Sequence, residues 1–255
     1  MNKTLASAFV AAAFVCPPVA LAQSAPAKPA PEYTFTGNAG LFSDYRFRGF
    51  TQTAYKPAFQ GGFDLAHKSG LYLGNWNSNV EQSLYTGASL EMDFYGGYKG
   101  TVGDFGYDVG YLYYYYPGSG RNGQTKIDNG ELYVGGSYGP VALKYYYATT
   151  RFFSLGEGTN VDTKGSQYLD LSASYDLGAG WGVNGHIGWQ KVKNLKQLGA
   201  SDDSYTDYKL GVTKDIEGWL LGASIVATSK KEFFTTGNGE DAGKSRLVVS
   251  VSKTF

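Results

Sequence analysis

Apolar and polar residues alternate at period two along most of the chain after residue 32. In the last segment, 245–255, Leu247, Val249 and Val251 share one face, and Arg246 and Ser250 share the other. Successive side chains of a β-strand point to opposite sides, so this period predicts a two-faced strand. The chain stops on an aromatic residue, Phe255, whose ring a lipid-facing position would bury.

The same pattern recurs between turn residues and predicts about twelve strands. We expect them at 33–50, 58–66, 71–78, 88–99, 105–116, 131–138, 141–149, 167–175, 181–192, 206–214, 219–228 and 245–255. Strands of about nine to eleven residues are long enough to cross a bilayer when tilted. The pattern does not assign the apolar face of 71–78, because Leu71 and Leu73 lie on one face and Tyr72 and Trp76 lie on the other.

The connections alternate in length. Turns near 68, 101, 139, 178 and 216 are short, whereas the loops near 54, 82, 123, 158, 198 and 236 are mostly longer and polar. Bacterial outer-membrane barrels have short periplasmic turns and long outer loops. The fold class expected is therefore all-β: a transmembrane, antiparallel, up-and-down β-barrel of about twelve strands with both ends on the periplasmic side.

A soluble sandwich or lipocalin-like barrel would also alternate, but its outer face would carry many charges. Here the polar faces hold a few charges among Ser, Gly and Tyr, which is typical of a barrel lumen. Aromatic residues also gather near strand ends, as in an interfacial girdle: Tyr45, Phe47, Tyr115, Tyr147, Trp181, Trp189, Trp219 and Phe255.

The first residues predict export. Lys3 precedes an apolar run over 5–21, and Ala20-Leu21-Ala22 offers a small-x-small cleavage pattern. We expect a cleaved signal peptide at 1–22, a Pro/Ala-rich periplasmic linker at 23–31 and the barrel at 32–255. Cleavage would remove the sole cysteine, Cys16, so the mature chain would have no disulfide.

Composition and charge narrow the function. The 255 residues carry 22 basic and 22 acidic side chains, a balance that argues against a nucleic-acid partner. Charged residues make up 17% of the chain, below the share usual for soluble domains, while Gly (36) and Tyr (22) are abundant. This composition favours short strands and aromatic belts.

Motifs for chemistry are weak. Residues 118–123 match G-x-G-x-x-G, but a strand follows instead of the helix that would meet phosphates. His186 lies on a polar face, and Asp170 and Ser172 lie on the polar face of the neighbouring strand, so a lumenal hydrolase is a minor alternative. We expect no enzymatic activity, no cofactor and no metal site, and we interpret the acidic pairs 202–203 and 240–241 as solvated loop charges.

Lumen-facing polar residues are the main candidates for function. The alternation assigns to the pore lining Asp44, Arg46, Arg48, Asp64, Glu91, Asp93, Tyr95, Asp108, Glu131, Tyr133, Lys144, Tyr146, Asp170, His186, Lys209 and Arg246. Paired across the lumen, these charges would close the interior; segregated by sign, they would select solutes. Arg46 and Arg48 are the strongest candidates for a filter, and Arg246 is expected beside them at the outer rim as one basic patch.

Four stretches resemble a known family: residues 40–53 (GLFSDYRFRGFTQT), 57–64 (PAFQGGFD), 70–79 (GLYLGNWNSN) and 91–98 (EMDFYGGY). They are similar to the TorF family of proteobacterial porins, which were long regarded as conserved proteins of unknown function. The resemblance covers nearly the whole mature chain and is strongest before residue 100. It implies an outer-membrane barrel and supplies no substrate.

The function expected is a porin-like channel for passive diffusion of small hydrophilic solutes in the outer membrane of a Gram-negative cell. The alternative from another class is a non-conducting structural or adhesin-type barrel with a filled lumen. The expected partners are outer-membrane lipid and lipopolysaccharide, the small solute, and the barrel-assembly machinery. Phe255 resembles the terminal signal that this machinery reads.

Overall fold

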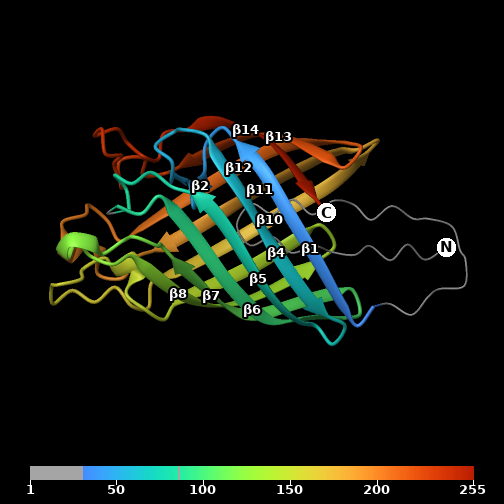
Figure 1. Ribbon diagram of the computed structural model, residues 1–255, viewed down its shortest axis with the longest axis horizontal. Helices are drawn as coiled ribbons and strands as arrows, with labels where there is room; N and C mark the ends of the chain where they lie inside the picture. The colour runs from blue at the N-terminus through green and yellow to red at the C-terminus, as the bar shows by residue number, and fades with distance from the viewer. Residues whose placement is uncertain (1–30, 86) are drawn as a thin grey trace, which may run out of the picture.

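The computed structural model describes residues 31–85 and 87–255, and these fold into one closed β-barrel (Figure 1). Within these ranges twelve strands form the wall, each paired antiparallel with its neighbours in chain order. The last strand pairs with the first and closes the cylinder. The wall strands are β1 (Tyr33–Phe42), β4 (Ala58–His67), β5 (Leu71–Asn79), β6 (Leu90–Val102), β7 (Phe105–Tyr115), β8 (Asp128–Tyr138), β9 (Val141–Ala148), β10 (Gln167–Gly178), β11 (Trp181–Lys191), β12 (Ser204–Ile216), β13 (Trp219–Thr228) and β14 (Arg246–Thr254).

Tight turns connect the strands at one end of the barrel, and longer loops connect them at the other (Figure 1). We call these the turn end and the loop end. In the described residues, the loops carry three short 3-10 helices, η1 (Arg121–Gly123), η2 (Phe152–Ser154) and η3 (Leu195–Leu198). The predicted all-β barrel is confirmed. The signal peptide and most of the linker fall in 1–30, outside the described residues.

The first predicted strand is wrong in its second half. Strand β1 ends at Phe42, and the next residues form a small separate hairpin of β2 (Arg46–Phe47) and β3 (Phe50–Thr51). The chain reverses at Arg48 and Gly49, which have φ angles of 45° and 88°. Positive φ at both central residues belongs to the tight hairpin turns that match strand twist. A period-two pattern extends across such a turn, which is why the sequence predicted one long strand.

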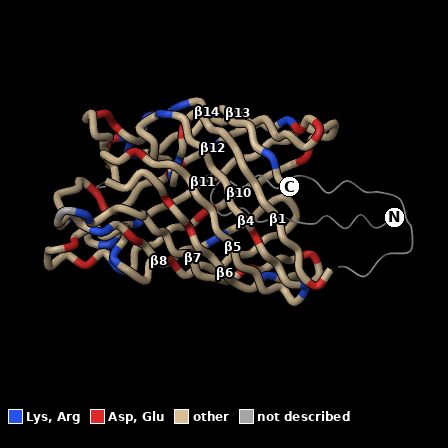
Figure 2. Tube along the Cα trace, in the orientation of Figure 1, with Lys and Arg blue, Asp and Glu red and all other residues tan. Residues whose placement is uncertain are grey.

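The outer face of the wall is apolar. Its exposed side chains include Phe35, Leu73, Val134, Leu210 and Ile225. The face that the sequence left open is now assigned, because Leu71 and Leu73 point outward while Tyr72 and Trp76 are covered inside. Charged residues gather at the two ends of the barrel and are sparser between them (Figure 2). The described residues contain no helix of the length and apolarity needed to span a bilayer.

Two lysines on the outer face, Lys214 and Lys253, lie at the turn end and contact tryptophans there. Lys253 Nζ lies 4.9 Å from the Trp219 ring centroid, and Lys214 Nζ lies 5.0 Å from that of Trp181. A lysine stem can cover apolar surface while its ammonium group reaches water. Trp181, Trp219 and Phe255 are exposed as the predicted girdle requires. Tyr45 and Phe47 do not belong to it, because Tyr45 is buried in the lumen and Phe47 packs edge-on against Tyr114.

Glycines in the lumen wall lie beneath tyrosine rings of neighbouring strands. Gly74 faces the ring of Tyr95, Gly110 lies under Tyr133, and a Cβ at either glycine would collide with that ring. An aromatic side chain laid over a strand glycine fixes register and lets the sheet curve. The excess of Gly and Tyr in the composition therefore has a structural use, which is to pack a narrow lumen.

Replacing Gly110 by alanine is expected to lower the unfolding free energy by about 1–3 kcal/mol, the usual cost of overpacking a dense interior. The new Cβ would meet the Tyr133 side chain and the Gly96 carbonyl oxygen. Gly135→Ala is the matched control, because there a Cβ lies 3.2 Å from the flexible Lys144 side chain. The folded fraction against temperature in detergent measures both; equal transitions would contradict this packing role.

Candidate functional site

The segment between β1 and β4, residues 43–57, folds into the loop end of the lumen. Asp44 organises it, since its Oδ1 accepts hydrogen bonds from the hydroxyls of Thr51 (2.5 Å) and Thr53 (3.1 Å). At the hairpin turn, a Cβ on Gly49 would lie 2.8 Å from Asp207 Cβ, so the turn packs directly on the wall. We call residues 43–57 the inner segment.

Arg48 fastens the inner segment to the opposite wall. Its guanidinium donates to Glu131 on β8 through two hydrogen bonds, of 3.1 and 2.6 Å, and to Gln190 on β11 at 2.7 Å. It also lies 4.2 Å from the Tyr168 ring centroid and 5.3 Å from that of Tyr146. Burial opposes the charge, but Glu131 raises the pKa of Arg48 above its ordinary value, so the group stays cationic.

Arg46 and Arg246 lie against the same tyrosine, Tyr55, at the loop end. Their guanidinium carbons lie 5.1 and 4.6 Å from the ring centroid of Tyr55. Arg46 is paired with Asp44 at 2.5 Å and donates to the carbonyl of Lys244 at 3.0 Å. Arg48 does not join them, because the hairpin turn directs it into the lumen. The expected patch of three arginines is therefore a patch of two.

A second charge pair lies in the wall of β7 and β9. Lys144 Nζ is 2.8 Å from Asp108 Oδ2, and Tyr72 donates to Asp108 Oδ1 at 2.6 Å. The Tyr72 and Tyr133 hydroxyls are also hydrogen-bonded to each other. Both Asp108 and Lys144 are buried. The hydroxyl groups of these lumenal tyrosines therefore take part in hydrogen bonding around the buried Asp108 carboxylate, in addition to the packing of their rings.

His186 lies between two carboxylates. Its Nδ1 is 2.6 Å from Asp170 Oδ2, and its Nε2 is 3.0 Å from Asp207 Oδ1. Both ring nitrogens are thus engaged, although Ser172 lies directly opposite on β10. A hydrolase base needs one nitrogen directed at its nucleophile. This arrangement links three strands and does not form the triad considered from the sequence.

Glu91 and Asp93 are exceptional among the buried lumenal carboxylates. Tyr45 donates to Glu91 Oε1 at 2.9 Å, but Glu91 Oε2 and Asp93 Oδ1 are buried without a hydrogen-bond partner among the described residues. No ion pair joins either carboxylate to a described cation, whereas Asp44, Asp108 and Glu131 each have one. Asp64 also lacks a cation and accepts from the Tyr95 hydroxyl at 2.7 Å.

The lumen changes in character from the turn end to the loop end. Along β10–β14 and β1, inward residues near the turns are small, polar and partly exposed: Thr36, Asn38, Ser172, Asn184, Thr213, Ser224, Ser250 and Ser252. Near the loops, the inward residues are buried: Tyr168, Gln190, Asp207, Val226 and Val248. The lumen is therefore an open vestibule at the turn end and is packed by the inner segment at the loop end.

The residues that alternation assigns to the pore lining face the interior of the barrel or lie at its loop end. The sequence did not identify Gln190, which binds Arg48, or Tyr45, which binds Glu91, as members of this network, and it did not pair Asp207 with His186. Alternation does place Gln190 and Asp207 on inward faces. Their partners depend on contacts between distant strands, which the pattern does not contain.

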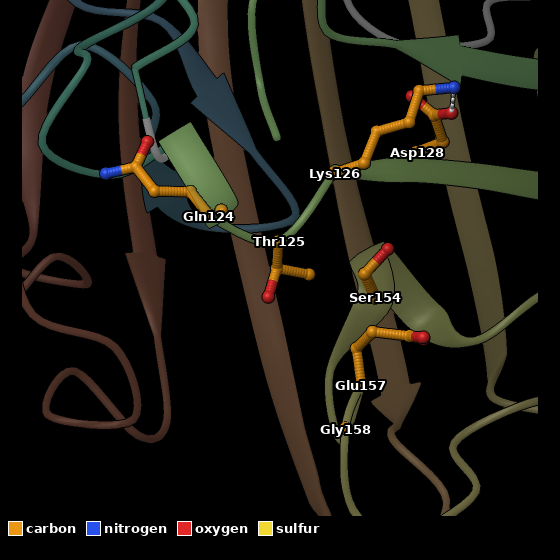
Figure 3. A pocket seen from close by; sticks show the side chains of 8 residues that line it. Gln124, Thr125, Lys126, Asp128, Ser154, Glu157 and Gly158 are labelled. Carbon is orange, nitrogen blue, oxygen red and sulfur yellow. Dashed lines mark ion pairs between the residues drawn. The ribbon is translucent and has the colours of Figure 1, made fainter. Parts of the chain in front are cut away.

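A polar cleft of about 540 Å³ lies outside the lumen, between the loops that follow β7 and β9 (Figure 3). Gln124, Thr125 and Lys126 line one side, and Ser154 and Glu157 line the other. Lys126 forms an ion pair with Asp128 at 2.5 Å. The cleft lies at the loop end, away from the charge network of the lumen.

The solved structures to which this chain is similar include a porin. The KdgM porin in complex with disordered oligogalacturonate aligns with a TM-score of 0.53 at 9% identity, covering 87% of this chain and 99% of that one. OccAB4 of Acinetobacter baumannii aligns with a TM-score of 0.43 at 13% identity, covering 84% of this chain and 57% of that one. OccAB3 of the same organism gives 0.42 and 14%, covering 89% and 65%.

A comparison with curated proteins found no match. A family model does match, over residues 26–255, which is nearly the whole chain. The chain belongs to the Gcw_chp family, described as a bacterial protein of unknown function.

Proposed function

We propose that this protein is an outer-membrane channel for small hydrophilic solutes, constricted by its inner segment. The observation that carries the proposal is the contrast between an apolar outer face and a lumen lined by polar residues and ion pairs. A lipid-spanning barrel requires this arrangement, and a soluble barrel would reverse it. Export through the signal peptide at 1–22 and the TorF resemblance of residues 40–98 are part of this proposal.

The KdgM porin, which shares the fold, has been solved in complex with disordered oligogalacturonate. For this chain we propose the broader class of small hydrophilic solutes. Its vestibule carries Ser, Thr and Asn side chains, which hydrogen-bond sugars and similar solutes without demanding charge. Lipid, lipopolysaccharide and the barrel-assembly machinery are the other proposed partners.

Purified protein in a planar bilayer is expected to give discrete conductance steps, because water and ions can follow the polar lumen when the inner segment moves. Liposomes containing the barrel are expected to admit small sugars faster than empty liposomes. Heat-unfolded protein is the control for both measurements. A folded barrel that never conducts, even after Arg48 is replaced, would contradict the proposed channel function.

The second candidate is a non-conducting barrel, favoured by the buried side chains at the loop end of the lumen. Arg48 and Glu131 are nearly inaccessible to solvent there. The conductance experiment separates the two functions directly. A hydrolase is not proposed, since both His186 nitrogens bind carboxylates.

A further inference from the structure

We infer that Glu91 and Asp93 make the open channel selective for cationic solutes over anionic ones. The inference rests on the proposed channel function and names the charge of its preferred solute. Both residues lie on β6 with their side chains inward, near the loop end where the inner segment packs. The sequence favoured Arg46 and Arg48 as the filter, but the contacts of the charged groups favour Glu91 and Asp93 instead.

The two arginines have little free charge to offer a solute. Arg48 is bound by both oxygens of Glu131, and Arg46 is bound by Asp44. Lys144 is likewise paired with Asp108. A cation held by a carboxylate presents a small net field to a passing ion. The positive groups of the constriction are therefore largely neutralised.

The acids on the other side of the lumen have no paired cation among the described residues. Glu91 and Asp93 are two residues apart on one face of β6, with Asp64 on β4 beyond them. None of the three is paired with a cation among the described residues. Lys209 is a lumenal cation, but it lies beside His186 on the far wall. Glu91 and Asp93 are the buried charged residues of the described chain that lack an ion pair, whereas Lys209 and Arg246, which also lack one, are more exposed. The buried charge without a partner is therefore acidic and lies on one wall, as a transverse selecting field requires.

The inner segment covers this acidic pair in the present arrangement. The Tyr45 hydroxyl binds Glu91, and Tyr45 packs edge-on against Trp76 with ring centroids 5.3 Å apart. A carboxylate charge without water or a cation is costly, so covering the pair disfavours its charged form. When the inner segment moves aside, water and a passing cation reach both carboxylates. The pair then acts on solutes at the narrowest part of the path.

The test is the reversal potential of the channel in a potassium chloride gradient. Wild-type protein is expected to favour potassium, and the double variant Glu91→Gln with Asp93→Asn is expected to lose most of that preference. These substitutions keep side-chain shape, and a heat-modifiability assay checks that the barrel has folded. Glu232→Gln, on the exposed loop before β14, removes one charge outside the lumen and is expected to leave the potential unchanged.

The outcomes separate this inference from the channel function. A barrel that does not conduct defeats the channel itself. A barrel that conducts with anion preference, or with the same cation preference in the double variant, overturns the role of Glu91 and Asp93 and leaves the channel intact.

Discussion

Replacing Arg48 by alanine is expected to raise the conductance of the barrel severalfold. The guanidinium holds the inner segment to Glu131 and Gln190, on strands far from its own position in the chain. Removing one member of a buried ion pair costs about 3–5 kcal/mol, because the remaining charge is left without a partner. That energy destabilises the packed arrangement relative to one in which the inner segment leaves the lumen. Single-channel recording measures the change.

Two variants sharpen this test. Arg121→Ala removes an exposed arginine from an outer loop and is expected to conduct as the wild type does. Arg48→Lys retains the charge and loses the planar fork that binds both oxygens of Glu131, so an intermediate conductance is expected. If folded Arg48→Ala conducts no better than Arg121→Ala, Arg48 does not hold the constriction.

The conformation at the hairpin turn supports this role for Arg48. A non-glycine residue at positive φ is disfavoured, and its neighbour Gly49 has no room for a Cβ against the wall. Strained backbone persists where surrounding contacts over-determine it. Here those contacts are the ion pair with Glu131 and the aromatic rings around the guanidinium.

The wall of the barrel could be predicted from the sequence because its two faces meet opposite environments. Lipid outside and polar contacts inside impose period two on every strand, so Leu71 and Tyr72 differ in kind. The strand starting at Trp219 was predicted with the same bounds that the structure has, 219–228. The lumen face of Glu91 and Asp93 follows from the same rule.

The inner segment could not be predicted, because it meets a single environment. Tyr45 and Phe47 alternate with Asp44, Arg46 and Arg48 as they would in a wall strand. Inside the lumen, however, apolar and charged groups pack together, so alternation no longer reports a lipid face. The pairing of Arg48 with Gln190 joins residues 142 positions apart. Such pairings form only when the barrel is closed. The sequence alone therefore cannot show which acids are left without a cation.

Deleting Phe255 is expected to lower the ratio of folded to unfolded barrel by about fivefold to thirtyfold, the effect of 1–2 kcal/mol. Its backbone closes the seam between β14 and β1, with Phe255 N donating to Gly37 O at 2.9 Å and Gly37 N donating to Phe255 O at 2.7 Å. Each net hydrogen bond is worth about 0.5–1.5 kcal/mol. Its ring lies on the outer face over Gly37, where a Cβ would approach Phe255 within 2.7 Å.

Phe255→Ala separates the seam from the proposed assembly signal, because it keeps both backbone hydrogen bonds and removes the ring. If the assembly machinery reads the ring, this variant assembles poorly in cells but refolds normally in detergent. If the ring only stabilises the seam, both yields fall together. Lys253→Ala, two residues earlier on the same outer face, is the matched control and is expected to assemble normally. Normal assembly of Phe255→Ala in cells would remove the signal and leave β1 and β14 to close the barrel through their backbone pairing alone.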